Sequence, residues 1–118
     1  STSMTQANGS TFSFTPTSTS SNVLIMASAQ FTVGLLAGNN TTGQLELRES
    51  GVLVGSTYSA TAAAESQGVA FQAPVTMQVS LSNASTSART FAFYHKSSSA
   101  SATIQTTLIK WTIMEIGA

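Results

Sequence analysis

The chain has 118 residues and a mass of 12.1 kDa, which is enough for one domain with its own core. Only 7% of the residues are charged, the formal net charge is zero, and neither Cys nor Asp occurs. Four scattered Lys and Arg residues cannot supply the basic surface that nucleic acid or an anionic membrane requires, so neither is expected as a partner. Without Cys, a disulfide framework is excluded.

The N-terminal part predicts a polar lead-in followed by strands. Residues 1–10 are small and polar and predict a lead-in or linker, so the single predicted domain spans residues 11–118. Thr11–Thr15 predicts a short strand that ends at Pro16. Asn22–Val33 alternates with period two and predicts a long strand. One face of that strand holds Val23, Ile25, Ala27, Ala29, Phe31 and Val33.

Two hairpins are predicted in the middle of the chain. Gln44–Glu49 and Val52–Tyr58 flank Ser50-Gly51, a two-residue turn whose register would pair Leu47 with Val54 and Leu45 with Ser56. The second predicted hairpin joins Val75–Ser82 to Ala88–Lys96 and would place Val79 near Phe91 and Met77 near Phe93. A separate short strand, Val69–Phe71, is expected to close at Pro74.

The last predicted strand, Thr103–Ile116, is apolar on both faces from Leu108 onward. An antiparallel sheet normally leaves one face in water, so this strand needs cover on both sides. Val23–Met26 has the same property. Either the strand is central in a thick core or one face meets another subunit, and which face does so is left open. The predicted interface residues are Leu108, Ile109, Lys110, Trp111, Ile113 and Met114.

About eight strands separated by Ser, Gly and Pro predict an all-β antiparallel sandwich. A jelly roll is the first choice and an immunoglobulin-like sandwich is the second. The most apolar stretch, Val23–Gly38, is too short for a membrane span and contains Ser28 and Gln30, so no membrane insertion is expected.

The inventory of reactive side chains argues against an enzyme. His95 is the single histidine, and a Ser–His–Asp triad cannot form without Asp. Glu46 and Glu49, the closest carboxylates, face opposite sides of a strand and do not form a glycosidase pair. One His without Cys or Asp does not make a zinc site, so no metal and no cofactor are expected.

A binding surface is the remaining option. Sugars are held by aromatic faces and by amide and hydroxyl hydrogen bonds. Aromatic and polar residues at strand ends and turns are therefore the predicted ligand-binding residues, although ordinary surface roles are the plainer interpretation of each. They are Asn39, Asn40, Tyr58, Tyr94, His95 and Lys96.

Three segments carry a family resemblance. They are the predicted hairpin Gln44–Gly55, the strand Arg89–Tyr94 and the ending Leu108–Ile116, within a match over Asn22–Ala118. The chain resembles C-terminal domains of bacteriophage tail fibres and tailspikes, and its layout is similar to trimeric jelly rolls of the tumour-necrosis-factor type. No site residue is carried over, because such domains share no fixed receptor motif.

The resemblance implies a homotrimeric tip that trimerises the fibre, binds host surface polysaccharide, or does both. Such a protein is made in the host cytoplasm and acts extracellularly as part of the virion. Lys110 and Glu115 would pair between subunits near the threefold axis. A bacterial adhesin, pilus-type module or other carbohydrate-binding β-sandwich is the alternative function.

Overall fold

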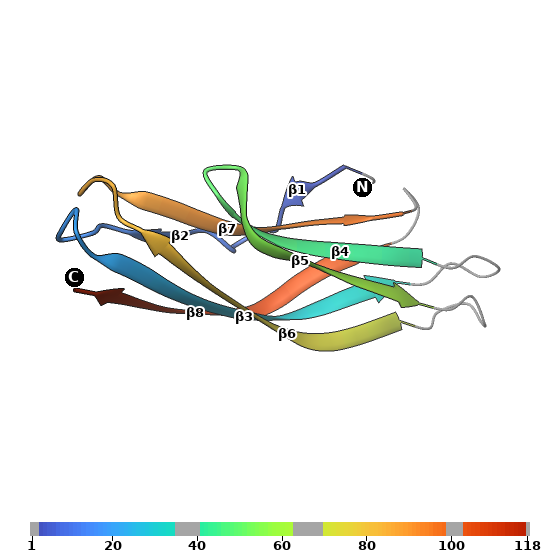
Figure 1. Cartoon of the computed structure of the whole chain (residues 1–118). Coiled ribbons are helices and arrows are strands. Elements are labelled where there is room, and N and C mark those ends of the chain that lie inside the picture. The colour runs from blue at the N-terminus through green and yellow to red at the C-terminus, as the bar shows by residue number, and fades with distance from the viewer. Residues whose placement is uncertain (1–2, 35–40, 63–69, 99–102, 118) are drawn as a thin grey trace.

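The computed structural model describes residues 3–34, 41–62, 70–98 and 103–117. It confirms an all-β fold built of two antiparallel sheets, seen as two layers in Figure 1. One sheet has the order β1-β7-β4-β5, with β2 also pairing with β7, and the other has the order β6-β3-β8. The strands are β1 (Thr5–Gln6), β2 (Phe12–Phe14), β3 (Asn22–Gly34), β4 (Thr41–Glu49), β5 (Val52–Ala62), β6 (Ala70–Ser82), β7 (Arg89–Ser97) and β8 (Ile104–Ile116).

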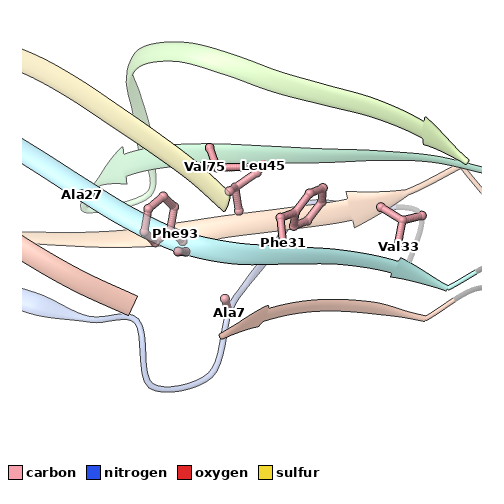
Figure 2. Packing of buried hydrophobic residues seen from close by; sticks show 8 residues of the cluster. Ala7, Ala27, Phe31, Val33, Leu45, Val75 and Phe93 are labelled. Atoms are coloured by element: carbon pink, nitrogen blue, oxygen red, sulfur yellow. The ribbon is translucent and has the colours of Figure 1, made fainter. Parts of the chain in front are cut away.

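The core lies between the layers, and β3 supplies much of it. The six residues predicted to share one face of this strand are all buried, and the residues between them are half-buried. Phe31, Leu45 and Phe93 belong to one buried cluster, which Figure 2 shows between strands of both layers. Ile25 and Phe91 belong to a second cluster further along the sandwich. Period-two alternation therefore identified the inward face of β3 correctly.

The first predicted hairpin is confirmed as β4–β5. Ser50 and Gly51 have φ of 48° and 84°, as a two-residue turn with both central residues in the left-handed region requires. The predicted register fails at Leu47, which falls within a register shift, and Leu45 pairs with Tyr58 and not with Ser56. A register shift between Glu46 and Arg48 causes the difference, and Gly55 on the facing strand has φ of 118°.

The second predicted hairpin is wrong. β6 pairs with β3 and β7 pairs with β4, so the connection between β6 and β7 crosses from one sheet to the other. Val79 packs against the second buried cluster, which contains Phe91, but it does so from the other layer. Alternation shows which face of a strand is buried but does not show which strand it pairs with.

Strand β6 is also longer than expected. Pro74, predicted to close a separate strand, lies within β6 opposite Gln30. β6 is an edge strand of its sheet, and an edge accepts a proline because one row of its N–H groups has no partner strand. Within the predicted lead-in, Thr5–Gln6 forms β1 against His95 and Tyr94.

A bulge in β8 changes the alternation that the sequence predicts. Ser28 pairs with Lys110 and Gln30 pairs with Thr107, so Leu108 and Ile109 both lie opposite Ala29. Thr107 and Leu108 are consecutive and both exposed, whereas Ile109 packs against the core. The predicted single face from Ile104 to Ile116 is therefore interrupted, because one extra residue reverses the facing of every residue after it.

Candidate functional site

Half-buried and exposed apolar side chains adjoin one another on the outer face of the β6-β3-β8 sheet. Val23 and Ile25 point into the core, so their neighbours Leu24 and Met26 must face outward. Leu24 pairs with Met114, which is 53% exposed, and Asn22 pairs with Ile116, which is 45% exposed. We call Leu24, Met26, Met114 and Ile116 the apolar patch.

The structure divides the predicted interface residues between the two faces of β8. Ile109, Trp111 and Ile113 pack against the two buried clusters of their own chain. The Trp111 ring stacks on Phe12 at a centroid distance of 5.7 Å and lies 5.5 Å from Phe93. The other three residues, Leu108, Lys110 and Met114, are exposed on the outer face. Of the predicted interface residues, only these three outward-facing ones are therefore available to contact a second copy of the chain.

Glu115 lies on the opposite face of β8 from Lys110, against the segment between β2 and β3. Its carboxylate accepts hydrogen bonds from the Thr17 and Ser18 backbone N–H groups and from the Thr17 and Ser21 hydroxyls. These donors, led by the Ser21 hydroxyl, hold the pKa of Glu115 below its ordinary value. The Glu115 carboxylate is therefore held within its own chain, and the expected pairing of Lys110 with Glu115 between subunits stays a prediction.

Tyr94 and Lys96 face outward from the other sheet, on strand β7. Tyr94 pairs with Glu46 and Lys96 pairs with Gln44 across the β7–β4 ladder. The Arg48 guanidinium carbon lies 5.0 Å from the centre of the Tyr94 ring, and Arg48 also forms an ion pair with Glu46. This outer face therefore carries an aromatic ring and charged groups, in contrast to the apolar patch on the opposite layer.

His95 faces the interior, because successive residues of a strand alternate and Tyr94 faces out. Its Nδ1 lies 2.8 Å from the Thr106 hydroxyl, a contact that joins β7 to β8 across the layers. Burial lowers the pKa of His95 below its ordinary value. A half-buried strand histidine is the plain structural interpretation of this residue.

Tyr58 also faces inward, on edge strand β5. It pairs with Leu45, and its ring meets Phe31 edge-to-face at a centroid distance of 6.1 Å. Asn39 and Asn40 lie outside the described residues. The predicted ligand-binding residues thus do not form one cluster, since Tyr94 and Lys96 share an outer face and His95 and Tyr58 point between the sheets.

Three members of the apolar patch, Leu24, Met26 and Ile116, were missing from the predicted interface set. The signal for two of them was present, because Val23–Met26 is apolar on both faces. β3 pairs with β8, so the two segments that are apolar on both faces lie side by side. Neither segment alone shows that the other is its partner.

In the part of the chain that the structure describes, no three His, Cys, Asp or Glu side chains come together as a metal site. Among the same residues there is also no helix long and apolar enough to cross a membrane. Comparison of the chain with protein-family models, with curated proteins and with solved structures gave no match.

Proposed function

We propose that this chain is the trimerising, receptor-binding tip of a fibre of the bacteriophage tail-fibre or tailspike type, with a jelly-roll topology and no catalytic activity. The resemblance of the segments Gln44–Gly55, Arg89–Tyr94 and Leu108–Ile116 supports the family. Connections that change sheet after β2, β3, β5, β6 and β7 support a jelly roll. In this proposal the protein acts on the virion, outside the host cell.

The observation that carries the proposal is the apolar patch. Met114 and Ile116 are large apolar side chains about half exposed on adjoining strands with Leu24 and Met26. A contiguous exposed apolar surface of this kind marks an interaction site more often than a free surface. We propose that three copies bury their apolar patches against one another.

The remaining surface suits a polar, uncharged receptor. Ser and Thr together make up 38 of 118 residues, and hydroxyl groups occupy outward positions where charges usually stand. Three equal sites per trimer would raise the effective affinity for a repeating polysaccharide even if each site binds weakly. Tyr94 and Lys96, which share an outer face, remain the proposed contacts on the five-stranded sheet.

The test of assembly is light scattering on the purified chain at micromolar concentration. Three chain masses are expected for wild type. Met114→Gln, which places a polar group in the apolar patch, is expected to shift the protein toward monomer. Leu53→Gln is the matched control, because Leu53 is 43% exposed on β5, in the other sheet. A monomeric wild type, or equal effects of the two variants, would contradict the proposed assembly.

The test of receptor binding is a glycan array followed by incubation with the bound polysaccharide. Binding without release of oligosaccharides is expected. Release of oligosaccharides would identify a depolymerase and contradict the non-catalytic part of the proposal.

A further inference from the structure

The bulge in β8 presents a strained leucine on the outer face of the three-stranded sheet. Leu108 has φ of 53°, a left-handed backbone conformation that non-glycine residues rarely adopt, and its side chain is 73% exposed. Neither burial nor packing accounts for the strain. Bulges are frequent at sheet edges and beside functional sites, where they redirect a side chain, and β8 is an edge strand of its sheet.

A hollow of about 540 Å³ lies beside Leu108 on this face. Its short polar side chains are Ser28 on β3 and Thr76 on β6, which pair with each other across the ladder. Longer side chains border them, with Leu108 and Lys110 from β8 and Gln30 from β3. Ala29, Pro74 and Val75 complete the lining, so the hollow is mostly apolar and carries hydroxyl, amide and cationic groups as well.

Among the described residues, Lys110 is the one charged side chain that lines this hollow. Strands β3 and β6 contain no charged residue, and the other charged residue of β8, Glu115, is held by the loop on the opposite face. Within the described part of the chain, Lys110 has no hydrogen-bond or ion-pair partner. By contrast, Arg48 and Arg89 each pair with a glutamate.

We infer that this hollow binds an acidic sugar unit, a uronate or another carboxylate-bearing pyranose, of the polysaccharide that the domain contacts. The Lys110 ammonium donates to the carboxylate, Ser28, Thr76 and Gln30 bond the ring hydroxyls, and Leu108 contacts the apolar face of the ring. The inference rests on the proposed function and names the sugar class for it. The hollow begins at Ser28–Thr76, two residue pairs along from Met26, so it adjoins the apolar patch on the same outer face. The site therefore requires that three copies bury only the apolar patch and leave Leu108 and Lys110 accessible.

The experiment is a chemical-shift titration of the ¹⁵N-labelled full chain with trigalacturonate and, separately, with its fully methyl-esterified form. The ester keeps the rings and hydroxyls but removes the charge. Shifts are expected at Ser28, Gln30, Thr76 and Lys110 with the acid, and at least about tenfold weaker binding with the ester, as expected for loss of one charge-assisted hydrogen bond. Equal binding of the two forms would overturn the inference.

Two variants of Lys110 form a matched pair. Lys110→Gln is expected to weaken trigalacturonate binding about tenfold. Lys110→Arg keeps a positive charge at the hollow and is expected to keep the affinity within about threefold. Equal losses in both variants would show that the charge at this position does not hold the sugar and would overturn the inference.

The result also separates this inference from the proposed function. A trimer that binds neutral polysaccharide but not trigalacturonate would overturn the acidic-sugar site and leave the proposed function standing. A monomer that binds trigalacturonate through Lys110 would support the site and contradict the proposed assembly.

Discussion

Arg89 donates hydrogen bonds from Nε and Nη2 to the two carboxylate oxygens of Glu49, over 2.6 and 2.7 Å. Its Nη1 also donates to the Ser82 carbonyl and to Asn83 Oδ1, and the Asn83 amide donates to the Ser21 hydroxyl. β7 and β4 belong to one sheet, whereas Ser82 ends β6 in the other. This set of bonds therefore ties the two layers together at one end of the sandwich.

Loss of the Arg89 guanidinium should destabilise the fold. Arg89→Met leaves the Glu49 carboxylate and the Asn83 side chain without their partner, and both members of the ion pair are largely shielded from water, at 17% and 22% exposure. We expect a loss of about 2 kcal/mol in the free energy of unfolding, measured by urea denaturation. Arg48→Met is the comparison, because Arg48 is similarly shielded but bonds only to Glu46 and to the Gly51 carbonyl within its own hairpin, so a smaller loss is expected. A smaller loss for Arg89→Met than for Arg48→Met would contradict the interlayer role.

Glu115 should make the stability of the folded chain depend on pH in the acid range. The hydrogen bonds from Ser21, Thr17 and Ser18 lower the pKa of its carboxyl in the folded state below the ordinary 4.5. The stabilisation is therefore complete above the unfolded pKa and is lost as the pH falls through the lower folded pKa. Melting temperatures of wild type and Glu115→Gln should differ at neutral pH and converge in acid. A constant difference across the pH range would contradict this account.

His95 should titrate below its ordinary value of 6.5, because burial disfavours the charged ring. Since the folded pKa is lowered, the unfolded chain binds the proton first as the pH falls, and stability declines between 6.5 and the folded pKa. Histidine ring resonances followed by NMR should show the lowered value directly. His95→Gln should flatten the stability profile over that interval, and an unchanged profile would contradict the prediction.

Trp111 should matter for folding of each chain and Met114 for association between chains. Trp111→Ala removes a ring that packs against Phe12 and Phe93, and we expect a loss of about 3 kcal/mol in the free energy of unfolding. Met114→Ala removes an exposed side chain and should change the unfolding of an isolated chain by less than about 0.5 kcal/mol. Denaturation at two protein concentrations separates the two effects, since only association depends on concentration.

The predicted binding site was less accessible to sequence reasoning than the fold was. Tyr58 and Tyr94 look alike as strand-end tyrosines, yet one packs on Phe31 and the other faces outward beneath Arg48. Their facing depends on strand register, and the register shift between Glu46 and Arg48 moved the partner of Leu45 from Ser56 to Tyr58. Local patterns do not show where such a shift occurs.

The sequence by itself determined the all-β class, the buried face of β3 and the Ser50-Gly51 turn, because these follow from side-chain alternation and local backbone preference. Tertiary structure alone decided that β6 and β7 lie in different sheets and that Leu108 and Lys110 share the outer face. Strand partners are chosen by contacts far apart in the chain, and a one-residue bulge reverses the facing of every side chain beyond it.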